Sequence, residues 1–204
     1  IEDLSAILNS KWPPPAIMMP KVRTADEVVL VDQLLGEAHH LTRIHVIIET
    51  NEGLEAAHEI ARASTRIDAL FFGAIDMAPE LRCDLSWENL LYARSRVVHA
   101  AASAGLDVID VPHLDLDDME GMRIAAEQAR ALGFAGKGSI HPKQIPILNE
   151  VFTPSPEKIA RARGVIGEFE AADTGLVVID GKLIEKPALR EMYRIVAIAD
   201  RMGL

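Results

Sequence analysis

The stretch that decides the fold runs from Ile44 to Gly73 and reads IHVIIETNEGLEAAHEIARASTRIDALFFG. Its two ends, residues 44–50 and 68–73, are short apolar runs of the length of strands, and their continuous VII and LFF triplets are typical of a sheet covered on both faces. Between them, residues 53–64 predict a helix. A strand, a helix and a second strand in succession indicate a βαβ unit with two parallel strands.

The same alternation extends on both sides of this unit. Further strands are expected over residues 16–22, 106–112 and 136–140, and a strand or hairpin arm over residues 176–185. Further helices are expected over residues 24–36, 87–104, 117–132, 143–151, 156–172 and 187–202. Gly105 and Gly133 follow two of these helices, as expected for glycines that end a helix. The pattern predicts an α/β protein built on a parallel sheet.

The number of strands limits the choice of fold. A TIM barrel typically needs about 250 residues, whereas this chain has 204 and opens on Ile1 rather than Met. We therefore expect a TIM (β/α)8-type barrel whose N-terminal strands are missing from this sequence, with the barrel portion over residues 1–172 and a C-terminal extension over residues 173–204. The alternative is a doubly wound open sheet, but no GxGxxG motif follows any expected strand.

Composition excludes several classes of function. The net charge is −10, the pI is about 5.1 and only 4% of residues are aromatic, so a nucleic-acid partner is not expected. No apolar run approaches the ~20 residues that cross a bilayer, so no membrane association is expected. Cys83 is the single cysteine, which excludes an intramolecular disulfide and favours a cytoplasmic protein.

Polar residues stand where the expected strands end. In chain order these residues are Lys21, Glu49, Asp76, Asp110, His113 and His141. In a βα barrel the carboxyl ends of the strands converge on one mouth, where catalysis takes place. Two carboxylates, Glu49 and Asp76, suit one hard cation such as Mg²⁺ and leave positions open for water and substrate oxygens.

Structural roles for the same residues remain open from the sequence alone. Glu49 and Asp76 also suit the beginning of a helix, where acids are favoured, and Lys21 also suits a solvated turn. The arginine pairs Arg94/Arg96 and Arg161/Arg163 predict solvated helix faces. The histidines and Cys83 form no recognised zinc pattern.

Longer strings carry a resemblance to a known family. The motifs ET, GxxD and GKxxIHPxQ follow one another in VIIETNEGL (46–54), LFFGAIDMAPEL (70–81) and GFAGKGSIHPKQIPILNEVFTPSPEKIARAR (133–163). MMPKV (18–22), residues 92–112 and IDGKLIEKPALR (179–190) match as well. With these strings the chain resembles the HpcH/HpaI aldolase/citrate lyase β-subunit family, which includes malyl-CoA lyases.

The resemblance implies a modified TIM barrel that forms a homotrimer or homohexamer. It implies a Mg²⁺- or Mn²⁺-dependent carbon–carbon lyase whose substrate is a 3-hydroxyacyl-CoA, such as malyl-CoA or citramalyl-CoA. Cleavage gives an acyl-CoA and a 2-oxo acid, and the reverse reaction joins them. The metal ligands fall on Glu49 and Asp76, and Lys21 matches a lysine near the site. The residues on the side of the CoA cleft are Gly136, Lys137, Ile140, His141, Pro142 and Gln144. The family's catalytic arginine, on an earlier strand, has no counterpart in this sequence.

The C-terminal motif departs from the family pattern. Members typically carry Asp in G-x-M-I-D, as a proton-transfer group that reaches a neighbouring subunit's site; here Glu185 takes that place in GKLIE (181–185). Asp180 is a nearby alternative, and Glu185 also suits the beginning of the last helix. Two other functions stay open: a lyase acting on free 2-oxo acids, and a non-catalytic barrel subunit.

Overall fold

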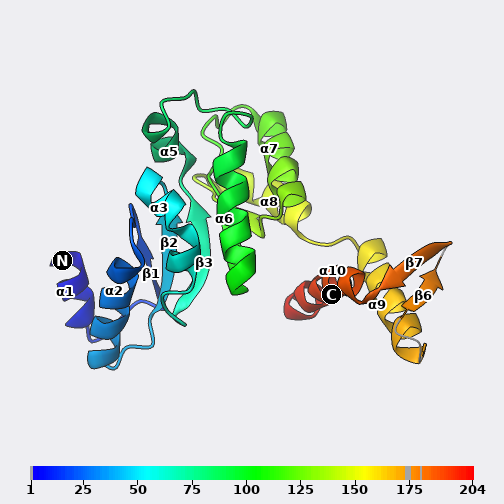
Figure 1. Ribbon diagram of the computed structural model, residues 1–204. Helices are drawn as coiled ribbons and strands as arrows, with labels where there is room; N and C mark the ends of the chain where they lie inside the picture. Colours follow the sequence, from blue (N-terminus) through cyan, green and yellow to red (C-terminus); the bar gives the residue numbers. More distant parts are fainter. Residues whose placement is uncertain (1, 173–175, 180) are drawn as a thin grey trace. The chain divides into compact units, whose positions relative to one another are not determined.

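The computed structural model describes residues 2–172, 176–179 and 181–204. The chain divides into two compact units, one up to Leu148 and one from Asn149 to Leu204 (Figure 1). Asp180, the alternative to Glu185, lies outside the described residues. No helix among the described residues is long and apolar enough to cross a membrane.

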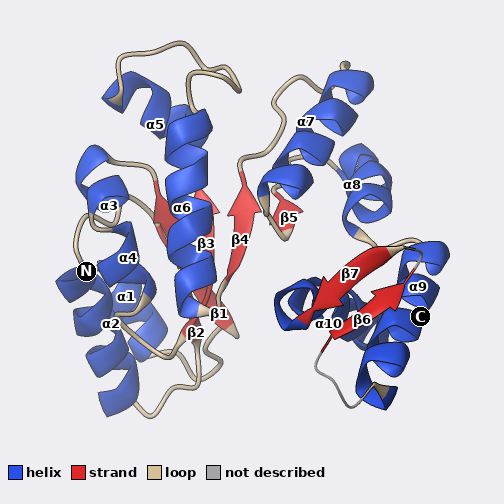
Figure 2. Cartoon of the chain, turned by 45° about the vertical axis from the view of Figure 1, so that its right-hand side comes forward, coloured by secondary structure: helices blue, strands red, loops and turns tan. Residues whose placement is uncertain are grey.

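A five-stranded parallel sheet forms the centre of the first unit (Figure 2). Its strands are β1 (Ala16–Met19), β2 (Arg43–Ile48), β3 (Ile67–Phe72), β4 (Asp107–Asp110) and β5 (Gly136–Lys137). They lie side by side in chain order, β1-β2-β3-β4-β5, and every neighbouring pair is parallel. A doubly wound sheet reverses its strand order at a switch point, whereas a barrel wall does not. The order therefore confirms the predicted barrel-type α/β fold, here as an open wall within the described residues.

Helices follow each of the first four strands. The first unit contains α1 (Glu2–Leu8), α2 (Ala25–Glu37), α3 (Asn51–Glu55), α4 (Ala57–Ala61), α5 (Ala74–Glu80), α6 (Leu91–Ala104), α7 (Met119–Leu132) and the 3-10 turn η1 (Pro142–Gln144); α8 (Ile145–Phe152) crosses into the second unit. α2 packs on α4, α4 packs on α6, and α6 packs on β3 and β4. The helices thus form a layer in the same order as the strands.

Alternate residues of the strands decide which face of the sheet is covered. Ile44, Val46 and Ile48 of β2 are fully buried, and the register places Leu70 and Phe72 of β3 beside Val46 and Ile48. The residues between them are half-buried on the other face; they include His45, Ile47, Phe71 and Ile109. One face therefore carries the core against the helices, and the other is the inner face of the barrel wall.

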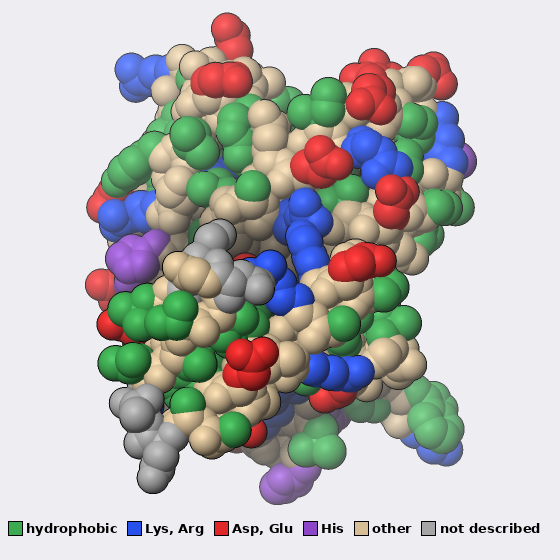
Figure 3. Space-filling view, turned by 90° about the vertical axis from the view of Figure 1, so that its right-hand side faces the viewer, with side chains coloured by type: hydrophobic (Ala, Val, Ile, Leu, Met, Phe, Trp, Pro, Cys, Tyr) green, Lys and Arg blue, Asp and Glu red, His purple; other side chains and the backbone are tan. Residues whose placement is uncertain are grey.

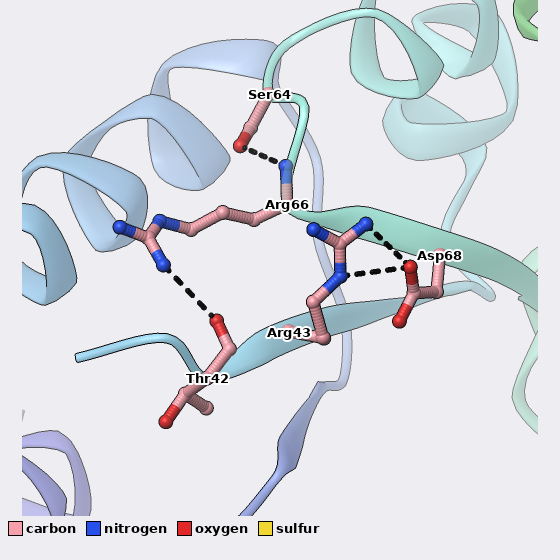
Figure 4. Close-up of polar contacts among 5 residues, drawn as sticks. All are labelled: Thr42, Arg43, Ser64, Arg66 and Asp68. Atoms are coloured by element: carbon pink, nitrogen blue, oxygen red, sulfur yellow. Dashed lines mark hydrogen bonds and ion pairs between the residues drawn. The ribbon is translucent and has the colours of Figure 1, made fainter.

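Ion pairs fix the amino-terminal edge of the sheet (Figure 4). Arg43 of β2 pairs with Asp68 of β3, and its Nε donates to Oδ1 at 2.8 Å. Arg66 donates to the Asp32 carboxylate of α2 at 2.6 Å and to the carbonyl of Thr42 at 3.4 Å. In barrels the amino-terminal edge serves stability, while the chemistry lies at the carboxyl edge.

The second unit is a helix pair with a β-hairpin. α9 (Pro156–Ala171) packs along α10 (Lys186–Met202), and β6 (Leu176–Ile179) pairs antiparallel with β7 (Lys182–Glu185). Its core contains Val165, Phe169 and Leu189. The sequence placed the start of the C-terminal part at residue 173, whereas the compact unit begins at Asn149, because α9 packs on α10 and β6.

Candidate active site

Glu49 stands immediately after β2, at the carboxyl edge of the sheet. It is 6% exposed, and it continues the alternation of His45 and Ile47 on the face away from the helices. Its Oε1 accepts a hydrogen bond of 2.9 Å from the backbone N–H of Lys21. Lys21 has a φ of 53°, which a residue with a side chain seldom adopts. This turn after β1 presents the amide of Lys21 to the carboxylate.

Asp76 lies in the first turn of α5, directly after β3. Its Oδ1 is 2.9 Å from the ammonium nitrogen of Lys21, and both side chains are exposed. Lys21 thus contacts both carboxylates, Glu49 through its backbone and Asp76 through its side chain. The structure brings together the three residues that the sequence placed at successive strand ends.

The electrostatics of this group favour an added cation. Burial raises the pKa of Glu49, the hydrogen bond from Lys21 opposes that rise, and the negative charge of Asp76 adds to it. The hydrogen bond with Asp76 and its charge raise the pKa of Lys21. Two carboxylates in each other's field, with oxygen donors only, fit a hard divalent cation that keeps several water ligands. In the described part of the chain, no group of three or more His, Cys, Asp or Glu has an arrangement that could hold a metal ion.

Two glycines make room for this arrangement. A Cβ at Gly73 would lie 2.4 Å from Oε2 and 2.5 Å from Cβ of Glu49. A Cβ at Gly53 would lie 2.2 Å from the carbonyl oxygen of Val22, in the turn that carries Lys21. Thr50 caps α3 by accepting from the Gly53 N–H at 3.0 Å. The glycines of the ETNEG and GAID strings are therefore required by close approach, which the sequence motifs signalled without giving the reason.

A buried ion cluster lies at the ends of β4 and β5. Asp110 accepts from Arg94 Nε at 3.1 Å and from Lys137 Nζ at 2.6 Å. Arg94 is 5% exposed, and its guanidinium carbon lies over the rings of Phe72 and Trp87, 5.0 and 4.7 Å from their centroids. The expectation that Arg94 is on a solvated helix face is wrong, since α6 turns this position toward the sheet.

The GKGSIHPKQ segment forms an ordered loop after β5. Gln144 is fully buried, accepts from the backbone N–H of Ile140 at 3.0 Å, and donates to the carbonyl of His113 at 2.9 Å. Nδ1 of His141 accepts from the backbone N–H of Lys143, just before Pro142 opens η1. Gly136 pairs with Ile109 of β4, and Ile140 is exposed. These contacts hold the loop; the contact of this segment with CoA stays a prediction.

Glu185 belongs to the second unit. It is the N-cap residue of α10, it is exposed, and its side chain makes no capping hydrogen bond. Its predicted role toward a neighbouring subunit stays a prediction.

Comparison with known proteins identifies the family. The family model described as HpcH/HpaI aldolase/citrate lyase matches residues 2–142. The chain belongs to the HpcH/HpaI aldolase/citrate lyase family. It is 33% identical to the L-malyl-CoA/beta-methylmalyl-CoA lyase of Cereibacter sphaeroides, over 92% of this chain and 68% of that protein. It is 30% identical to the citrate lyase subunit beta of Escherichia coli, over 100% of this chain and 71% of that protein.

A solved structure supports the same placement. The CitE protein of Mycobacterium tuberculosis, in complex with magnesium, acetoacetate and coenzyme A, matches with a TM-score of 0.78 and 27% identity, over 98% of this chain and 73% of that one. Family membership and the names of the relatives confirm the enzyme class predicted from the sequence, a carbon–carbon lyase. The family and the names of the relatives therefore do not favour the alternative in which the chain is a non-catalytic barrel subunit.

Proposed function

We propose that this chain is a Mg²⁺-dependent lyase that cleaves or forms a 3-hydroxyacyl-CoA such as malyl-CoA or citramalyl-CoA. The observation that carries the proposal is the carboxylate pair at the mouth, Glu49 and Asp76, joined through Lys21. The relatives named malyl-CoA lyase and citrate lyase subunit beta, and the solved complex with magnesium and coenzyme A, support it.

Glu49 and Asp76 would hold the cation, which supplies Lewis acidity toward the substrate's carboxylate and hydroxyl oxygens. Once solvent water has taken the hydroxyl proton, that oxygen forms a carbonyl and the carbon–carbon bond breaks. Its electron pair passes to the thioester as an enolate, while the other product is a 2-oxo acid. The exposed ammonium of Lys21 would neutralise the substrate's carboxylate.

The enolate carbon then needs a proton, and we assign its delivery to Glu185 of a neighbouring subunit. In the β6–β7 hairpin, Glu185 pairs directly with Leu176 and Leu183 with Val178, so these four side chains share one face. Leu176, Val178 and Leu183 are exposed on that face, whereas Val177, Ile179 and Ile184 on the other pack on the unit's core. Burial of this apolar stripe against another subunit would be favourable by about 25 cal/mol per Å².

Steady-state assays test the reaction. The protein is incubated with malyl-CoA or citramalyl-CoA, and release of glyoxylate or pyruvate is followed with Mg²⁺ and with a chelator. We expect 2-oxo acid release that requires the cation. Free malate and citramalate serve as the comparison, because equal turnover of these acids would replace the proposal with a lyase on free acids.

Asp76→Asn tests the metal assignment. We expect it to reduce turnover by at least about 10³-fold and to weaken Mg²⁺ binding in calorimetry, with the circular dichroism spectrum unchanged. Asp26→Asn is the matched control, because Asp26 is an exposed acid in the first turn of α2. If both variants behave alike, Asp76 is only a helix-start acid and the metal assignment fails.

A further inference from the structure

A pocket of about 300 Å³ opens in the first unit beside the ion cluster. Arg94 and Lys137 line it, together with Ile75, Trp87, Leu114 and Ala125. Asp110 pairs with Lys137 across β4 and β5 and shares the face of Val108, which is the face covered by the helices. The pocket is therefore on the side of the sheet opposite to the carboxylate of Glu49.

The charges of the buried cluster Arg94, Lys137 and Asp110 do not cancel. Arg94 and Lys137 share the single carboxylate of Asp110, so the cluster carries one excess positive charge. The side chains of Arg94, Lys137 and Asp110 are 6%, 3% and 0% exposed, so water screens this charge poorly. A buried charge without a counter-charge is costly, and an added anion would relieve that cost.

One nitrogen of the Arg94 guanidinium, Nη1, lacks a hydrogen-bond partner among the described residues. This nitrogen is buried, although Nε of the same side chain is bound to Asp110. Buried polar groups without partners are uncommon in folded proteins and cost free energy. Carboxylates and phosphates are the acceptors that a guanidinium group binds most strongly. Burial and the neighbouring charge of Arg94 lower the pKa of Lys137, although Asp110 opposes that effect.

We propose that this pocket is a binding site for a small aliphatic monocarboxylate, separate from the metal pair Glu49 and Asp76. One carboxylate balances the one excess charge of the buried cluster, and Ile75, Trp87 and Leu114 give an apolar wall for a short hydrocarbon chain. Asp115 also lines the pocket and disfavours a second negative charge on the ligand. The volume is at the lower limit of small-molecule sites, which suits a short acid.

Tryptophan fluorescence tests the proposal directly. The chain has two tryptophans, of which Trp12 is 83% exposed and Trp87 lines the pocket. A Trp12→Phe background therefore leaves Trp87 as the reporter. Butyrate is titrated into the double variant Trp12→Phe/Asp76→Asn, without Mg²⁺ or CoA. Failure of the metal site therefore does not affect the result. We expect a saturable change with butyrate and none with butyramide, which has the same chain but no charge.

Two variants locate the site. Arg94→Gln removes the charge and should weaken butyrate binding at least tenfold. Ala125→Phe fills the pocket from α7 and leaves the ion cluster in place, so it keeps the test decisive if Arg94→Gln fails to fold. Arg82→Gln, an exposed arginine on the loop after α5, is the matched control and should bind as the parent does.

Several results would overturn the proposal. They are the absence of a saturable change, equal binding of butyramide, and unchanged butyrate binding in folded Arg94→Gln or Ala125→Phe. Inorganic phosphate that binds more tightly than butyrate would also overturn it, because the site would then be one for phosphate.

Discussion

The ammonium nitrogen of Lys21 lies 2.9 Å from Oδ1 of Asp76, while the backbone N–H of the same lysine donates to Glu49. The Lys21 side chain therefore contacts a carboxylate oxygen that a cation bound by Glu49 and Asp76 would also use. The backbone contact does not depend on the nature of the side chain. Lys21 can thus be altered without removal of the amide that orients Glu49.

We expect Lys21→Met to bind Mg²⁺ severalfold more tightly than the parent, because the ammonium no longer competes for Asp76. Turnover should nevertheless decrease, because the substrate's carboxylate loses its neutralising partner. Calorimetry gives the affinity, and steady-state kinetics give the rate. Lys11→Met, at an exposed lysine of the same unit, is the control. Unchanged Mg²⁺ affinity and rate would mean that Lys21 is only a solvated charge.

Glu49→Gln should raise the melting temperature of the metal-free protein at neutral pH. Burial raises the pKa of this carboxyl in the folded state, so the unfolded chain holds fewer protons than the folded one between the two pKa values. The stability contributed by this group therefore decreases as pH rises through that interval, and the ionised group opposes folding above it. Gln keeps an acceptor for the Lys21 amide without the charge.

Thermal melts of parent and variant between pH 4 and pH 8 measure this effect. The difference in melting temperature should be largest at pH 8 and should shrink toward acid. Mg²⁺ should raise the melting temperature of the parent only, because the variant has lost a ligand. A variant that is less stable than the parent at pH 8 would contradict the assigned cost of the buried charge.

Gly73→Ala should disrupt the site while it leaves the sheet intact. The new Cβ would lie 2.4 Å from Oε2 of Glu49, so this carboxylate must move. We expect Mg²⁺ affinity to decrease at least tenfold. Gly164→Ala is the matched control: a Cβ there meets nothing within 4 Å, and in α9 it should stabilise the helix by roughly 0.5–1 kcal/mol. Normal Mg²⁺ binding by Gly73→Ala would show that Glu49 is not held as described.

The sequence predicted the convergence of Lys21, Glu49 and Asp76, because the carboxyl ends of neighbouring parallel strands meet at one edge. It did not predict that Lys21 acts through its backbone, because that contact depends on a positive φ at a residue with a side chain. The fifth strand was expected over residues 136–140 but ends at Lys137, because Lys137 pairs with Asp110, the last residue of the neighbouring strand β4.

Arg94 was missed because an arginine pair on a helix usually faces water. The signal was nevertheless present: Leu90, Ala93, Val97 and Ala101 are buried at helical spacing, and Arg94 falls within this stripe. What the pattern alone could not supply is the counter-charge, because Asp110 and Lys137 come from two other elements.

The proposed action of Glu185 on a neighbouring subunit gives the last prediction. Glu185→Gln removes the proton donor but keeps the size of the side chain, so the chemical step should decrease by about 10²-fold or more. Mg²⁺ and CoA binding should stay near normal. Glu191→Gln, at an exposed acid of α10, is the control and should keep full activity.

Mixed oligomers separate action within a subunit from action between subunits. Glu185→Gln protein still has Glu49 and Asp76, and Asp76→Asn protein still has Glu185, so neither alone has a complete site. After subunit exchange, an interface that joins the metal pair of one chain to Glu185 of the other is complete, and activity should return in proportion to such interfaces. Exchange is followed by energy transfer between fluorescent labels on the two variants. If the labels show exchange and no activity returns, Glu185 acts within its own chain or is only the acid that begins α10. In that case Leu183→Lys should leave the oligomeric state unchanged. If the apolar hairpin face docks on a neighbouring subunit, Leu183→Lys should instead dissociate the oligomer, which sedimentation measures.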